Sequence, residues 1–67
     1  MSDDPVIPPH LLVYRDEDWM PHVEDSVMYR GLRARELQRM AQDRWANAHG
    51  MWRAEFEDLQ ARQQAQA

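Results

Sequence analysis

Apolar residues recur at steps of four, four and three along the second half of the chain, between Leu37 and Leu59. This spacing averages close to the α-helical repeat, so the side chains share one face of a helix. We call these seven positions the apolar stripe: Leu37, Ala41, Trp45, Ala48, Trp52, Phe56 and Leu59. A buried aromatic side chain removes roughly 150–250 Å² from water, and a lone helix offers nothing to cover it. The stripe therefore predicts a partner surface.

Helix-forming residues extend beyond the stripe, because Ala, Leu, Arg, Gln, Glu and Met dominate from about residue 22 to residue 63. This composition predicts an all-α fold whose main element is a long amphipathic helix over about 22–63. Such a helix would be roughly 60 Å long, too long for a compact monomer. Gly31 and Gly50 are its only interruptions, and each costs about 1 kcal/mol against alanine inside a helix.

Gly50 leaves two architectures open. The segment Asn47–Gly50 resembles a helix C-cap, since glycine adopts the left-handed conformation easily, and this predicts a helical hairpin of 22–48 and 51–63. Against the hairpin, the apolar stripe keeps its phase across Gly50, and no good N-cap precedes Met51. We take the long or gently kinked helix as the first interpretation and the hairpin as the alternative.

The first twenty residues differ from the rest. Pro5, Pro8 and Pro9 hold the backbone near polyproline geometry and are followed by the short apolar run 11–14. That run has no hairpin partner, so we expect an extended arm over 1–20, then a helical segment over 21–64 and a frayed tail over 65–67. The arm docks either on a partner or back across its own helix. Its expected anchors are Leu12, Tyr14 and Trp19.

Charge is unevenly distributed along the chain, whose formal net charge is −4. The acidic patch expected in the arm and at the helix entry is formed by Asp16, Glu17, Asp18, Glu24 and Asp25. Five arginines follow between residues 30 and 44, which allows neutralisation within one chain or between two. The chain has no cysteine, no apolar run of membrane-spanning length and acids at its N-terminus, so we expect a cytoplasmic protein, or one within a virion or other assembly, neither secreted nor transmembrane.

The sequence offers little material for catalysis or for binding a cofactor. His10, His22 and His49 share no metal-ligand spacing, and Pro21 stands where a calcium loop would need glycine. Ser2 and Ser26 are the only serines, and the chain has no threonine and no cysteine, so it has few candidate nucleophiles. We therefore expect no enzyme, no cofactor and no metal site.

These features favour a small non-enzymatic helical protein that docks on a larger assembly or self-associates through Trp45, Trp52 and Phe56. A minor component of a phage particle or of a bacterial multi-subunit complex has this form. The alternative is a small acidic inhibitor whose acidic patch masks a basic site on a host enzyme or a nucleic-acid machine. A helical DNA-binding protein is a third class, disfavoured because the arginines fall on both sides of the predicted helix.

Overall fold

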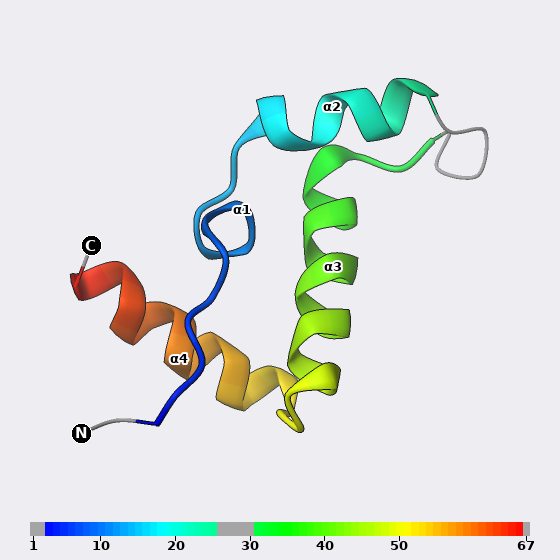
Figure 1. Ribbon diagram of the computed structural model, residues 1–67. Helices are drawn as coiled ribbons and strands as arrows, with labels where there is room; N and C mark the ends of the chain where they lie inside the picture. Colours follow the sequence, from blue (N-terminus) through cyan, green and yellow to red (C-terminus); the bar gives the residue numbers. More distant parts are fainter. Residues whose placement is uncertain (1–2, 26–30, 67) are drawn as a thin grey trace.

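The computed structural model describes residues 3–25 and 31–66, and of Asp25 only the backbone. It is all-α, as the sequence predicted, and no strand occurs in these two ranges. The helices are α1 (Pro9–Leu12), α2 (Asp16–Asp25), α3 (Ala34–Ala48) and α4 (Arg53–Gln66). Helix α3 packs against α1, α2 and α4, with α2 across its N-terminal end and α4 leaving its C-terminal end (Figure 1).

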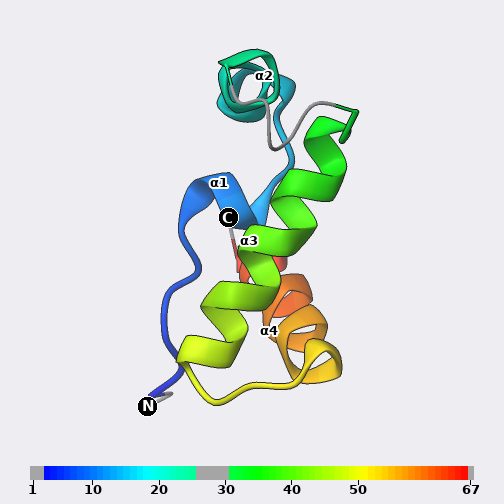
Figure 2. The same cartoon turned by 90° about the vertical axis from the view of Figure 1, so that its right-hand side faces the viewer.

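The arm runs from the N-terminus past α4 and up to α1, which lies beside α3 (Figures 1 and 2). Together these elements form a flat body of 43 × 23 × 14 Å. The arm is not extended throughout, because Pro9 starts a single helical turn. Proline is tolerated at the first helical position, because an amide there would have no acceptor within the helix. Of the two destinations open for the arm, the structure shows the second, in which it packs across its own helices.

Helix α3 ends in a Schellman motif at Gly50. The amide of Met51 donates to the carbonyl of Ala46 at 2.8 Å, and that of Gly50 to the carbonyl of Asn47 at 3.1 Å. Gly50 has a φ of 69°, in the left-handed region that glycine adopts with little strain. The helix C-cap read from residues 47–50 is thus confirmed.

The continuous helix over 22–63 is wrong. The chain is non-helical over 31–33 and again between α3 and α4, while residues 26–30, which that helix would also cross, lie outside the described ranges. The hairpin alternative placed the break correctly, but α4 turns away from α3 to form a corner instead of running back along it (Figure 1). The unbroken spacing of the apolar stripe across Gly50 led to the wrong architecture. The arm covers part of the stripe, so the stripe does not need to lie on one long helix that faces a partner.

The helical segment also begins earlier than residue 21, the start that the sequence predicted. Helix α2 starts at Asp16 and includes Pro21 in its interior, where we expected the arm to reach residue 20. Pro21 has no amide hydrogen, so the backbone carbonyl of Glu17, four residues earlier, lacks the hydrogen bond that a regular helix would give it. Three acids in the first turn of α2 favour this start, because negative side chains stabilise the positive end of the helix dipole.

The core joins the arm, α2, α3 and α4. Its buried apolar residues are Ile7, Leu11, Trp19, Ala34, Leu37, Ala46, Phe56 and Leu59. Phe56 and Ile7 are the largest fully buried side chains, so the arm and α4 meet at the centre of the core. Leu37 enters the core from α3, and Leu59 enters it from α4, about one turn after Phe56.

Five glutamines tie the backbone of the arm to α3 and α4; we call them the glutamine clamp: Gln38, Gln42, Gln60, Gln63 and Gln64. Helix α1 has only one turn, so its last carbonyls receive no hydrogen bond from an amide within the helix. Gln42 Nε2 donates to the carbonyl of Leu11 at 2.7 Å, and Gln64 Nε2 to that of Leu12 at 2.9 Å. Gln63 both donates to the carbonyl of Pro5 and accepts from the amide of Ile7, each at 2.9 Å. The clamp therefore fixes the arm through its backbone.

Candidate interaction groove

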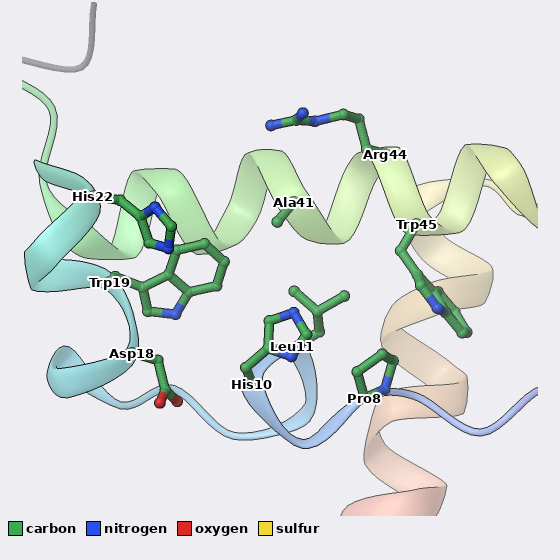
Figure 3. Close-up of a pocket in the computed structure, with 9 residues that line it drawn as sticks. All are labelled: Pro8, His10, Leu11, Asp18, Trp19, His22, Ala41, Arg44 and Trp45. Atoms are coloured by element: carbon green, nitrogen blue, oxygen red, sulfur yellow. The ribbon is translucent and has the colours of Figure 1, made fainter. Parts of the chain in front are cut away.

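An open groove of about 600 Å³ lies between the arm, α2 and α3 (Figure 3). We call it the tryptophan groove, because an indole stands at each end of it. Its lining residues are Pro8, His10, Leu11, Asp18, Trp19, His22, Ala41, Arg44 and Trp45. Leu11 and Ala41 form an apolar floor between the two indoles, and the polar side chains lie around it (Figure 3). An apolar concave surface with a few polar groups is the usual form of a binding site.

The clamp positions one wall of this groove. Pro8, His10 and Leu11 come from the arm, and Gln38 Nε2 donates to the carbonyl of His10 at 3.2 Å. The Leu11 carbonyl is held by Gln42 as described above. Since the arm is fixed through its backbone and by the burial of Leu11, this wall is pre-formed in the isolated chain.

Trp19 forms the α2 end of the tryptophan groove and is 8% exposed. Its ring lies between two imidazoles, with centroid distances of 5.9 Å to His10 and 6.1 Å to His22. The indole Nε1 is buried and has no hydrogen-bond partner among the described residues. A buried donor without an acceptor costs stability, so this end of the groove is less well satisfied than the clamped side.

Trp45 forms the other end and is half-buried. Its ring meets Phe56 edge-on, with centroids 5.8 Å apart at 70°, and stacks on His49 at 4.0 Å. His49 Nδ1 lies 2.7 Å from the Trp45 carbonyl, which keeps the imidazole over the indole. Trp45 is therefore held rigidly while part of its surface stays open to the groove.

Arg44 supplies positive charge at the edge of the groove. Its side chain is exposed and extends along α3 toward the α2 end (Figure 3). A hollow of about 150 Å³ beside the groove is lined by Trp19, His22, Leu37 and Arg44. No residue in the described ranges forms an ion pair with Arg44, whereas Arg53 and Arg62 each bridge two carboxylates.

The ten residues predicted to form an interface are distributed over three environments. Buried in the core are Trp19, Leu37, Phe56 and Leu59; half-buried against it are Leu12, Tyr14, Ala41 and Trp45; exposed are Ala48 and Trp52. Only Trp19, Ala41 and Trp45 of this set line the tryptophan groove. Leu37, Phe56 and Leu59 are covered by the chain itself, so they offer little surface to a partner in this structure.

Trp52 is the outlier of the apolar stripe. It lies in the corner between α3 and α4 and is 78% exposed. Its carbonyl accepts from the amide of Phe56 at 3.0 Å, so the backbone of Trp52 begins α4 although its side chain points out of the core. The break at Gly50 rotates Trp52 out of the phase that the sequence assigned to it.

The acidic patch does not present a single row of carboxylates. The hydroxyl of Tyr14 donates to Asp16, and Asp18 is among the residues that line the tryptophan groove. Glu17 and Glu24 are exposed on α2, and the side chain of Asp25 lies outside the described part of the chain. The hydrogen bond to Asp16, together with burial and the charge of that carboxylate, raises the pKa of Tyr14, while Arg35 beside the ring acts in the opposite direction.

Sequence reasoning missed the glutamine clamp and the part played by Ile7 and Leu11. The signal was present, because Gln38 and Gln42 are four residues apart, as are Gln60 and Gln64. Such pairs share a helix face. Their target was not visible, since only the folded arm brings its carbonyls to those faces.

The described residues contain no group of three histidines or acids arranged to hold a metal ion, and none of their helices combines the length and apolarity needed to cross a bilayer. Comparison with protein-family models, with curated proteins and with solved structures found no match. The geometry of the groove is therefore the basis for a functional proposal.

Proposed function

We propose that this protein is a small non-enzymatic interaction protein that binds a protein partner through the tryptophan groove. The observation that carries the proposal is the pre-formed apolar floor between Trp19 and Trp45, whose wall is held by the clamp. Interfaces gain most of their affinity from a few tryptophan, tyrosine and arginine side chains set in such pockets. Trp45 and Arg44 meet this description, and both remain accessible in the folded chain.

Two further features support a docking role. The chain buries its own core, so binding does not need to complete the fold, and Trp52 adds a second exposed indole at the corner. A small chain with a pre-formed groove and an exposed anchor suits a minor component of a larger assembly, such as a phage particle or a bacterial multi-subunit complex. The acidic-inhibitor class is less well supported, because Asp16 accepts a hydrogen bond from Tyr14 and Asp18 lines the groove.

Site-specific photo-crosslinking in the cell that makes the protein tests this proposal. A photoreactive residue at position 44, on the groove, is expected to form an adduct with one defined protein. The matched control is position 39, because Arg39 is also an exposed arginine of α3 but lies on the opposite side of that helix. Trp45→Ala should abolish the adduct at position 44.

A third position separates the two function classes. Glu24 is exposed on α2, away from the groove lining. Adducts at position 24 without adducts at position 44 would contradict the groove proposal and favour the acidic inhibitor. Equal adducts at positions 39 and 44 would show that the groove has no special role.

A further inference from the structure

The chain carries both a groove and a side chain that suits it. Trp52 is a large apolar residue that is 78% exposed at the corner between α3 and α4. The tryptophan groove has an apolar floor and an indole at each end, and aromatic rings pair well in offset or edge-on arrangements. An inserted indole would find such partners in Trp19 and Trp45.

Charge matches the same pairing. Glu55 is exposed and follows Trp52 by three residues, in the first turn of α4. Arg44 is exposed beside the groove. Neither side chain forms an ion pair with a described residue. An indole entering the groove would therefore bring a carboxylate toward an unpaired guanidinium, a combination that arginine binds with two parallel hydrogen bonds.

We infer that the tryptophan groove takes Trp52 of a second copy of this chain, with Glu55 of that copy against Arg44. The inference rests on the proposed function, because it names the partner of the same groove. One copy does not fill its own groove, since its Trp52 remains exposed at the corner. The occupant is thus supplied by a neighbouring copy.

The contact has a consequence for the form of the assembly. Each copy contributes one Trp52 and one groove, on different parts of its surface, so the interface joins unlike patches. Such a heterologous contact leaves a free indole at one end and a free groove at the other, and it propagates unless rotation closes a ring. We expect a series of oligomers that grows with concentration instead of a single dimer.

Sedimentation velocity of the full chain tests the inference. The concentration series runs up to about 1 mM, which detects even a millimolar Kd. Physiological salt is used because each copy carries a formal net charge of −4, whose repulsion is then screened. Trp52→Ala removes the indole and Ala41→Trp fills the groove floor, and each should weaken association at least tenfold. Val6→Ala is the matched control, because Val6 is 83% exposed and lies outside the groove, and it should leave association unchanged.

Mixing the two variants is the decisive step. Trp52→Ala retains an intact groove and Ala41→Trp retains an intact Trp52, so the mixture should form a one-to-one heterodimer that grows no further. Where circular dichroism shows that Ala41→Trp does not fold, Arg44→Glu on the exposed edge takes its place. Combining Arg44→Glu with Glu55→Arg in one chain should restore association that Arg44→Glu alone weakens severalfold.

The opposite results are equally clear. A wild-type chain that stays monomeric through the series, or a mixture that behaves as the sum of its separate components, overturns the inference. A monomeric chain whose position 44 crosslinks to a different protein overturns it while the proposed function stands. Absence of both association and crosslinks at position 44 removes both.

Discussion

The two sides of α3 differ in how completely their side chains are packed. On the side of α4, Phe56 and Ile7 are fully buried and the glutamine clamp supplies a donor to each carbonyl at the end of α1. On the side of α2, the tryptophan groove stays open and Trp19 buries a donor without a partner among the described residues. The closed side determines stability, and the open side is the one to which the proposed function assigns binding.

Phe56→Ala should have the largest effect, because it removes the side chain at the centre of the closed side. Truncation of a buried phenylalanine costs about 3–5 kcal/mol through lost burial and the cavity left behind. A domain of this size has a total stability of about 3–10 kcal/mol, so the variant should be largely unfolded on warming. Urea unfolding followed by circular dichroism measures the loss.

Trp52→Ala is the matched control for Phe56→Ala. It also truncates an aromatic residue of the apolar stripe, but one that is 78% exposed. We expect a change within about 0.5 kcal/mol, as for surface substitutions away from the core. Similar losses for the two variants would mean that the stripe is not divided between core and surface.

Gln42→Leu tests the polar part of the closed side. Gln42 is 4% exposed, and its loss leaves the Leu11 carbonyl with only the long bond from Gln60 at 3.5 Å. We expect a loss of about 1–2 kcal/mol, because an unsatisfied buried carbonyl keeps most of its desolvation penalty. The control is Gln64→Leu, which removes the same kind of bond at an exposed position and should cost less than about 0.5 kcal/mol. The urea midpoints of the two variants are compared. An equal cost for both would remove burial as the reason for the strength of the clamp.

Local rules predicted part of this architecture from the sequence. The C-cap at Gly50 follows from the conformational freedom of glycine. The structure also pairs Asp58 with Arg62, which are four residues apart on α4. Both depend on residues a few positions apart. Arg39 and Asp43 have the same spacing, yet Asp43 pairs with Arg53 from α4 at 3.2 Å. Once elements meet, a tertiary partner replaces a local one.

Periodicity could not decide what covers the apolar stripe. The helical wheel put Phe56 and Trp52 on one face, yet the first is fully buried and the second is exposed. The difference comes from the arm, whose Ile7 and Leu11 meet α4 through contacts about fifty residues apart in the sequence. Trp19, Ala41 and Trp45 were predicted as interface residues, and their grouping in one groove depends on α2 crossing α3.

Gly50→Ala tests the corner that separates the two sides of the comparison. A Cβ at this position meets no atom within 4 Å, so the cost comes from the backbone alone. A left-handed φ of 69° costs an L-residue about 1–2 kcal/mol. Thermal melting should therefore show a loss of about 1 kcal/mol for alanine and a smaller loss for Gly50→Asn, since asparagine tolerates this conformation. Equal melting of the wild type and the alanine variant would show that the Schellman motif does not hold α4 in place.

Trp19→Phe tests the open side and should cost less than Phe56→Ala or Gln42→Leu. The substitution keeps an aromatic ring between His10 and His22 but removes the indole Nε1, which is buried without an acceptor among the described residues. Loss of packing volume destabilises the variant, while loss of an unsatisfied donor relieves a penalty of about 1–3 kcal/mol, so the two effects offset each other. We expect a net change within about 1 kcal/mol in urea unfolding, smaller than that of Gln42→Leu although the side chain removed is larger. A loss above about 3 kcal/mol would mean that the indole nitrogen is satisfied in solution, and the open side would then be as complete as the closed one.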